Sequence, residues 1–216
     1  PNDGFLKGLR ERCDTHQILL IFDEVMTGFR LSAGGAQELL GVKPDLTTFG
    51  KIIGGGLPVG AYGGSREIMN QIAPEGPVYQ AGTLSGNPVA MAAGMAILRK
   101  LYEHPEIYKQ VEQTTRQITA GITNILSRQG LKYTINQIGS MYSLFFTDQK
   151  VTNFETAKST NAQLFGAYFR GMLSRGIYLA PSQFESLFIS NAIQSTEVDA
   201  ILKATDEVLL EMHETR

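Results

Sequence analysis

Apolar residues along the chain form either helix-spaced patterns or short continuous runs, and the two kinds alternate. At the start, Phe5, Leu6 and Leu9 recur at helical spacing, and the apolar run QILLIFDEV follows at residues 17–25. This pattern predicts a helix over residues 4–15 and then a buried strand. Buried strands that alternate with helices are typical of an α/β layer with a largely parallel sheet.

The same pattern analysis divides the rest of the chain into two parts. In the first part it predicts strands over residues 44–50 and 59–64, a helix over 65–73 with Ser65 as its N-cap, and a helix from Pro88 to His104 that is rich in small residues. In the second part it predicts a more polar helix over 106–128, strands within 133–147 and 186–192, a helix over 161–176 that Gly176 ends, and an amphipathic helix over 195–214. We therefore expect two domains, residues 1–105 and residues 106–216.

The composition is typical of a soluble globular protein. Of the 216 residues, 43% are hydrophobic and 19% are charged, and the formal net charge is -2. These values argue against a nucleic-acid-binding face, a polybasic membrane patch and disorder. No apolar run approaches the roughly 20 residues of a membrane-spanning helix, so we expect neither nucleic acid nor a membrane as a partner.

Cysteine and histidine are too sparse for a metal site or a disulfide framework. Cys13 is the single cysteine, and His16, His104 and His213 are scattered along the chain. We therefore expect no bound metal, and a location inside a cell or an organelle. Because Pro1 lacks an initiator methionine and a helical pattern follows at once, we also expect that an upstream part is missing.

The acids that end ILLIFDE and the Gly50-Lys51 pair resemble the two halves of a phosphate-loop NTPase, but the match fails in detail. A phosphate loop needs Ser or Thr after the Gly-Lys pair to hold magnesium, and another glycine six residues before the lysine. Here Ile52 follows Lys51, and Asp45 occupies the upstream position. We therefore set the NTPase interpretation aside.

Lys51 lies in the stretch TTFGKIIGGGLPVGAYGG, residues 47–64, among glycines and apolar residues and without an acidic residue to pair it. Two interpretations are open. A loop lysine usually points into water. Glycines on both sides, however, allow backbone to approach a ligand closely, and a lysine removed from water becomes a nucleophile for a carbonyl group. The second interpretation favours a covalent bond between Lys51 and an aldehyde cofactor such as pyridoxal phosphate.

Pyridoxal phosphate needs an acid at its pyridine nitrogen and an apolar group against its ring. Asp23 ends an apolar strand, at the carboxyl end where α/β sheets gather ligand groups. The alternative, that Asp23 and Glu24 only begin a solvated turn, fits the spacing equally well. Val25 would face the same side as Asp23 if the strand continued.

The cofactor phosphate needs hydrogen-bond donors. In AGTLSGNP, Thr83 and Ser85 supply hydroxyl groups beside glycines just before a predicted helix, which is a usable anion site. An ordinary N-cap turn is an equally common use of such a segment.

Three long motifs, in this order, resemble the class III, fold-type I pyridoxal-phosphate aminotransferases: LIFDEVMTGFR, PDLTTFGKIIGGGLPVGAYGG and AGTLSGNPVAMAAGMAIL. A fourth stretch, GIYLAPSQFESLFIS, extends the similarity towards the end of the chain. The resemblance implies an α/β fold. Residues 1–105 would form the second part of the large, mostly parallel-sheet cofactor domain, and residues 106–216 the α+β C-terminal small domain.

The resemblance also implies roles for individual residues. Lys51 would hold pyridoxal 5′-phosphate covalently and move protons, and Asp23 would pair with the pyridine nitrogen. Val25 would pack on one face of the ring, and Thr83 would bind the phosphate of the cofactor held by the partner subunit of a homodimer.

Two further residues, Tyr79 and Glu185, match positions that lie near the substrate in the family. The upstream half, which in the family holds the phosphate loop, the ring-stacking aromatic residue and substrate-binding groups, is not in this chain. Those roles therefore fall to no residue here.

Within the family, the motifs resemble most closely the members that move an amine within one small-molecule substrate, with the cofactor in its pyridoxal and pyridoxamine forms. This implies an isomerase of the bacterial cytoplasm or the plastid stroma, active as a homodimer with shared active sites. Two alternatives stay open. One is an ordinary aminotransferase acting between an amine and a keto acid, which would share every cofactor residue, and the other is a non-catalytic dimerisation fragment.

Overall fold

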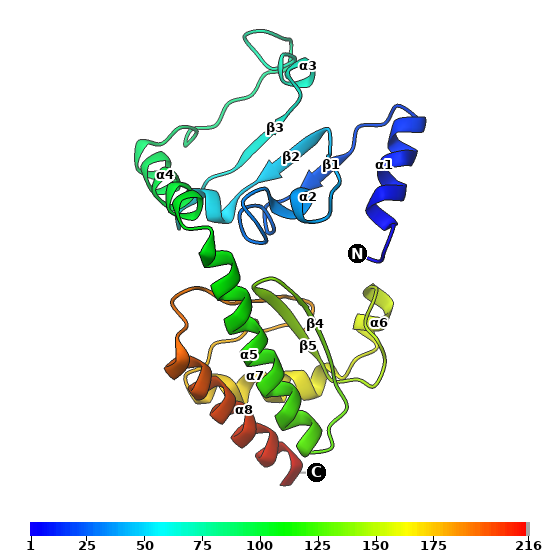
Figure 1. The fold of residues 1–216 in the computed structure, drawn as a ribbon, viewed down its shortest axis with the longest axis vertical. Helices are drawn as coiled ribbons and strands as arrows, with labels where there is room; N and C mark the ends of the chain where they lie inside the picture. The colour runs from blue at the N-terminus through cyan, green and yellow to red at the C-terminus, as the bar shows by residue number, and fades with distance from the viewer. Residues whose placement is uncertain (215–216) are drawn as a thin grey trace. The chain divides into compact units, whose positions relative to one another are not determined.

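The structure, a computed structural model, describes residues 1–214 (Figure 1). The chain divides into two compact units, Pro1–Pro105 and Glu106–Arg216. Each unit has its own sheet of three strands, and each is described below by itself.

The first unit is a small α/β arrangement. Its elements are α1 (Phe5–Thr15), β1 (Ile21–Asp23), α2 (Gly35–Leu39), β2 (Leu46–Phe49), the 3-10 helix η1 (Lys51–Gly54), β3 (Ala61–Gly64), α3 (Arg66–Met69) and α4 (Pro88–Glu103). β1 and β2 are parallel, whereas β2 and β3 are antiparallel. The parallel pairing expected from the sequence is therefore found between β1 and β2. β3 runs the other way because the segment after β2 holds only a 3-10 turn, too short for a crossover helix.

The prediction of a fully buried strand over residues 17–25 is wrong for this chain. Ile18, Leu19 and Ile21 are 58%, 54% and 55% exposed, although Leu20 between them is 6% exposed. The reason is that β1 is an edge strand, and α1 covers only one of its faces, where the small core around Cys13 and Leu20 lies. Ile21 therefore faces solvent beside the buried Leu20, whereas Ile18 and Leu19 lie before the start of β1.

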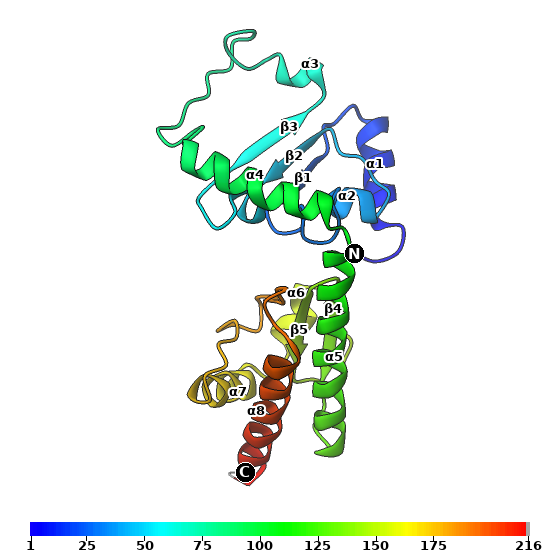
Figure 2. The ribbon, with the colours of Figure 1, turned by 60° about the vertical axis from the view of Figure 1, so that its left-hand side comes forward.

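Small residues allow α4 to pack directly on η1, the segment that begins with Lys51 (Figure 2). A Cβ on Gly94 would lie 2.3 Å from the carbonyl oxygen of Ile53, and a Cβ on Gly55 would lie 2.5 Å from the carbonyl oxygen of Ala93. Side chains at these two glycines would force the backbones apart. The close packing expected of this helix is confirmed, and it holds the backbone after Lys51 in place.

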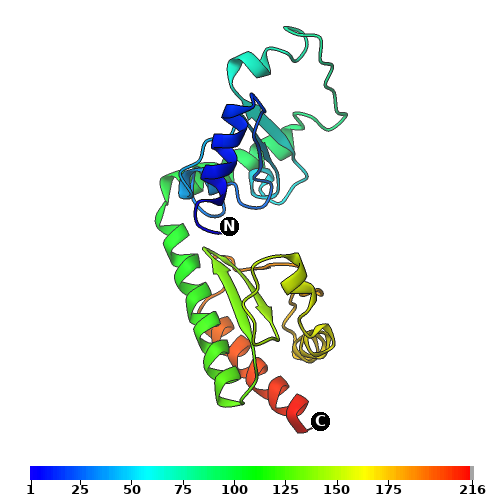
Figure 3. The same ribbon diagram turned by 90° about the vertical axis from the view of Figure 1, so that its right-hand side faces the viewer.

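The second unit packs helices against an antiparallel sheet. Its elements are α5 (Glu106–Arg128), β4 (Thr134–Ile138), β5 (Met141–Phe145), α6 (Phe154–Lys158), α7 (Ala162–Ser174), β6 (Leu187–Phe188) and α8 (Ser195–Glu214). α8 packs against α5 and α7 (Figure 3). In the core that these helices share with β5, the hydroxyl groups of Tyr168 and Thr205 form a buried hydrogen bond of 3.0 Å. Burial raises the pKa of Tyr168 to about 12, so the hydroxyl stays neutral.

Local signals place several element ends as expected. Ser65 caps α3 by accepting a hydrogen bond from the Ile68 amide at 3.4 Å, and α7 ends before Gly176, whose φ is +78°. The strand predicted over residues 186–192 is shorter, since only Leu187–Phe188 pairs with β5. The sequence pattern does not predict α2 or α6, because a five-residue helix is too short to display apolar periodicity.

Candidate functional site

The candidate site lies at the carboxyl ends of β1 and β2, where Asp23 ends one strand opposite Thr48 of the other. The Asp23 side chain is exposed. Its Oδ1 accepts hydrogen bonds from the Val25 amide at 3.0 Å and from the Thr48 hydroxyl at 3.3 Å. Among residues 1–214 no hydrogen bond to Oδ2 is recorded, so this oxygen can accept one from a ligand N–H group.

Val25 does not continue the strand as the sequence analysis assumed. The strand ends at Asp23, and Val25 lies in a turn. Even so, its side chain packs against the residue before Lys51, since a Cβ placed on Gly50 would lie 3.1 Å from Val25 Cγ1. The turn, and not strand alternation, brings an apolar group next to the backbone of the lysine.

Lys51 begins η1, one residue after the end of β2, with Gly50 between them. Its φ is +48°, in the left-handed region, which costs a residue with a side chain about 1–2 kcal/mol. Such strain gathers at functional sites, where the surrounding structure imposes it. The side chain is exposed in this chain, so the expectation that apolar neighbours withdraw its amine from water is not met by the described residues. These glycines and apolar side chains support the backbone and leave the amine accessible.

Thr83 and Tyr79 lie in the long segment between α3 and α4. Tyr79 is 84% exposed, and Thr83 is exposed as well. The helix that follows is capped by Asn87, whose Oδ1 accepts from the amides of Val89 at 3.1 Å and Ala90 at 3.2 Å. Of the two uses considered for this segment, the ordinary capped turn therefore accounts for these amides, and the Thr83 hydroxyl remains available to a ligand.

The loop around Thr83 borders a pocket of about 620 Å³. Gly82, Leu84 and Ser85 line it from the loop, opposite Phe49 of β2 and Ile53 of η1. The structure thus brings the loop to the 3-10 helix that carries Lys51, but within residues 1–214 no hydrogen bond joins Thr83 to Lys51 or Asp23.

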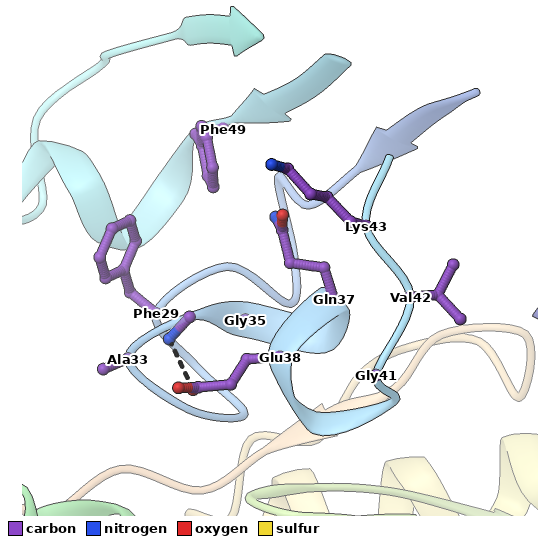
Figure 4. Close-up of a pocket in the computed structure, with 10 residues that line it drawn as sticks. Phe29, Ala33, Gly35, Gln37, Glu38, Gly41, Val42, Lys43 and Phe49 are labelled. Atoms are coloured by element: carbon purple, nitrogen blue, oxygen red, sulfur yellow. Dashed lines mark hydrogen bonds between the residues drawn. The ribbon is translucent and has the colours of Figure 1, made fainter. Parts of the chain in front are cut away.

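A second pocket, of about 560 Å³, lies beside α2 (Figure 4). Gln37 and Lys43 line it together with Phe29 and Phe49. Within the same pocket wall, the Gly34 amide donates to Glu38 Oε2 at 2.9 Å. The pocket shares Phe29 and Phe49 with the first one, and the centroids of these two rings lie 5.8 Å apart.

Glu185 belongs to the second unit, in the segment before β6, and its side chain is exposed. Its neighbours fix that segment. The Gln183 side chain is buried and donates from Nε2 to the Ala157 carbonyl at 3.3 Å, and the Phe184 ring lies 5.8 Å from that of Phe154. Glu185 is therefore presented by an ordered segment, and its role near a substrate stays a prediction.

The combination at β1 and β2 fits a flat heteroaromatic cofactor with an aldehyde. Asp23 offers an acceptor oxygen, Val25 an apolar surface and Lys51 an accessible amine, all within the two strand ends and the turns that follow them.

Among residues 1–214, no group of three or more histidine, cysteine or acidic side chains could hold a metal ion. No helix among them is both long and apolar enough to cross a membrane.

Thr48 is a site residue that the sequence analysis missed. Nothing in the sequence states the register of β1 against β2, and only that register places the Thr48 hydroxyl on Asp23. We expect Thr48→Val in the complete protein to weaken the binding of such a cofactor about two- to tenfold by removing one hydrogen bond that orients the carboxylate. Thr48→Ser, which keeps the hydroxyl, should retain the parent affinity. Calorimetric titration measures the dissociation constant, and equal values for both variants would contradict the role.

The aminotransferase class-III family model matches residues 1–206. The glutamate-1-semialdehyde 2,1-aminomutase of Cytophaga hutchinsonii is 57% identical over 213 residues, which cover 99% of this chain and 50% of that protein. The chain thus spans about half the length of the curated relatives it matches.

Two solved structures illustrate the similarity of the fold. An omega-transaminase from Sphaerobacter thermophilus superimposes with a TM-score of 0.84 at 34% identity, over 96% of this chain and 47% of that one. A glutamate-1-semialdehyde-aminomutase from Pseudomonas aeruginosa, in complex with PMP, superimposes with a TM-score of 0.85 at 26% identity, over 98% of this chain and 48% of that one. The fold is therefore that of fold-type I enzymes.

Proposed function

This chain belongs to the class-III aminotransferase family, and from that premise we propose that it is part of a glutamate-1-semialdehyde 2,1-aminomutase. This isomerase converts glutamate-1-semialdehyde to 5-aminolevulinate, a tetrapyrrole precursor, by moving an amine between neighbouring carbons of one molecule. The observation that carries the proposal is the 57% identity to a relative of that name over 99% of the chain. Because the chain spans half of that relative, the activity is proposed for the complete protein.

We propose pyridoxal 5′-phosphate, alternating with pyridoxamine 5′-phosphate, as the cofactor. The PMP complex of the Pseudomonas aeruginosa protein supports this proposal, as do the free oxygen of Asp23 and the accessible amine of Lys51. When bound, this cofactor withdraws electrons from the carbon that loses a proton, and it carries the transferred amine.

The residues of this chain then have distinct tasks. The Asp23 carboxylate binds the pyridine N–H as an ion pair and keeps that nitrogen protonated. Val25 lies against one ring face and excludes water from it. Lys51 Nζ, flexible on its four-carbon stem, would hold the cofactor covalently at rest, and as a free amine it would remove a proton from, or deliver one to, the substrate carbon that reacts.

Other roles extend beyond the two strand ends. We propose that Thr83 binds the phosphate of the cofactor in the partner subunit of a homodimer, and that Tyr79 and Glu185 contact the substrate. In this scheme residues 1–105 belong to the cofactor domain and residues 106–216 to the small domain. The bacterial origin of the similar relatives supports a location in the bacterial cytoplasm.

A transaminase that acts between an amine and a keto acid is the second candidate. The omega-transaminase of Sphaerobacter thermophilus favours it, because it shares the fold at 34% identity. Both candidates require the same cofactor contacts, so only the substrate separates them.

The test uses the purified complete protein. We expect it to convert glutamate-1-semialdehyde to 5-aminolevulinate without any added keto acid, with the pyridoxamine form as the competent starting state. Product formation is measured colorimetrically or by mass spectrometry.

Turnover that stops without a keto-acid acceptor would assign the protein to the transaminases. A protein that shows no visible absorbance after mixing with pyridoxal phosphate and gel filtration does not bind the cofactor. That result would favour the third interpretation, a non-catalytic dimerisation fragment.

A further inference from the structure

Glu24, next to Asp23, is a buried carboxylate whose acceptor positions are all engaged. It is 1% exposed. Oε2 accepts from the Thr27 hydroxyl and from the Ala36 amide, both at 2.7 Å. Oε1 accepts from the Gln37 amide at 2.9 Å and from its side-chain Nε2 at 3.2 Å. Because a buried charge is tolerated only when it is well hydrogen bonded, these donors are what keeps Glu24 inside.

The backbone of Glu24 is held as firmly as its side chain. Its amide donates to the Thr48 carbonyl of β2 at 2.9 Å, and its carbonyl accepts from the Gly28 amide at 2.8 Å. The space around it is closed, since a Cβ on Gly35 would lie 2.5 Å from Glu24 Oε2 and a Cβ on Gly28 would lie 2.8 Å from its carbonyl oxygen. Glu24 therefore joins β2, the turn that follows β1, and α2.

Glu24 also lies between the two residues proposed to touch the cofactor. Asp23 is exposed and Val25 half-buried, whereas Glu24 is directed to the other side, towards α2. Figure 4 shows Gln37 and Gly35 on that helix. Any movement of Glu24 moves the backbone of both neighbours, and with it the hydrogen bond from the Val25 amide that orients the Asp23 carboxylate.

We propose that Glu24 is a positioning residue, which anchors the turn after β1 to α2 so that Asp23 and Val25 are presented to the cofactor in a fixed geometry. This inference rests on the proposed function. Displacement of a catalytic group by about 1 Å can cost on the order of 10²-fold, so a rigid anchor directly behind Asp23 has a functional consequence. A purely structural Glu24 would contribute to stability alone.

The experiment separates these two roles by measuring cofactor affinity apart from stability. The apo form of the complete protein is titrated with pyridoxamine 5′-phosphate, which binds without a covalent bond to Lys51 and so reports the Asp23 contact. The dissociation constant is measured by calorimetry at a temperature where every variant is folded, and the thermal midpoint of each variant is recorded separately.

For Glu24→Gln we expect the dissociation constant to rise at least about tenfold, because the new NH₂ group faces N–H or O–H donors and the turn must shift. Thr27→Val removes one hydrogen-bond donor to Glu24 and should raise the dissociation constant about two- to tenfold. Thr27→Ser, which keeps the hydroxyl, should restore the wild-type value.

Thr205→Val is the matched control. The Thr205 hydroxyl forms a buried hydrogen bond of 3.0 Å with the Tyr168 hydroxyl in the core of the second unit, so its loss lowers stability but leaves every donor to Glu24 in place. We expect a lower thermal midpoint with a dissociation constant within about twofold of wild type.

Two results would overturn the inference. One is a Glu24→Gln protein with a reduced midpoint and an unchanged dissociation constant. The other, decisive also if Glu24→Gln does not fold, is a Thr27→Val protein that binds pyridoxamine 5′-phosphate as tightly as Thr27→Ser. If the wild-type protein does not bind pyridoxamine 5′-phosphate, both the proposed function and this inference are wrong. If the wild-type protein binds it normally and one of the two results above is found, only the inference about Glu24 is wrong.

Discussion

Lys51→Ala in the complete protein is expected to lose turnover by several orders of magnitude while it still binds the cofactor noncovalently. Lys51 begins η1 just after Gly50, the residue against which Val25 packs, and its side chain is exposed. Proton transfer by a positioned side chain alone contributes roughly 10²–10⁴-fold, and the covalent attachment is lost as well. Steady-state kinetics measures the rate. Borohydride reduction of the parent enzyme followed by peptide mapping should place the label on Lys51.

Two further variants control for the backbone and for lysine chemistry in general. Lys51 has φ of +48°, a conformation that glycine adopts without cost. Lys51→Gly should therefore fold at least as stably as Lys51→Ala and be equally inactive. Lys7→Ala, at an exposed lysine of the same unit that lines neither pocket, should keep the parent rate. A borohydride label on any other lysine would rule out the assigned role.

Asp23→Asn is expected to lower activity by about 10²-fold or more with little change in folding. The amide keeps an acceptor for the Val25 amide and the Thr48 hydroxyl, but it removes the charge that keeps the pyridine nitrogen protonated. A hydrogen bond to a charged group is worth about 1.5–3 kcal/mol, and both cofactor binding and electron withdrawal depend on it. Kinetics and the visible spectrum of the bound cofactor are the measurements.

The matched control is Asp14→Asn, which removes an exposed carboxylate paired with Arg10 at 2.7 Å. Surface ion pairs of this kind contribute about 0–1 kcal/mol, so activity should stay at the parent level. An Asp23→Asn enzyme as active as the parent would exclude Asp23 from the site.

Local chemistry explains why much of the fold could be predicted. The helices at α1, α4, α5, α7 and α8 are long enough to display their apolar period. Their ends carry side chains such as Asn87 and Asn161 that satisfy the first free amides by themselves. The short helix α2 gives no such signal, because its first amides are satisfied by Glu24, a residue distant in sequence.

The sequence by itself determined the family and singled out the residues that we propose to carry the chemistry. A lysine among glycines and an acid at the end of an apolar run are properties of composition and spacing, and the long motifs around them are specific enough to indicate the family. These features depend only on the order of residues along the chain, so they can be recognised without knowledge of the three-dimensional structure.

Only the tertiary structure decided how those residues meet. The register of β1 against β2 places Thr48 on Asp23, and a turn, where the sequence suggested a continuing strand, brings Val25 to Gly50. It also decided that Glu24 is buried while Asp23 beside it is exposed. The physical reason is that register, burial and hydrogen bonding between distant segments depend on which surfaces pack together, and adjacent residues with the same carboxylate chemistry carry no local signal of the side to which each will turn.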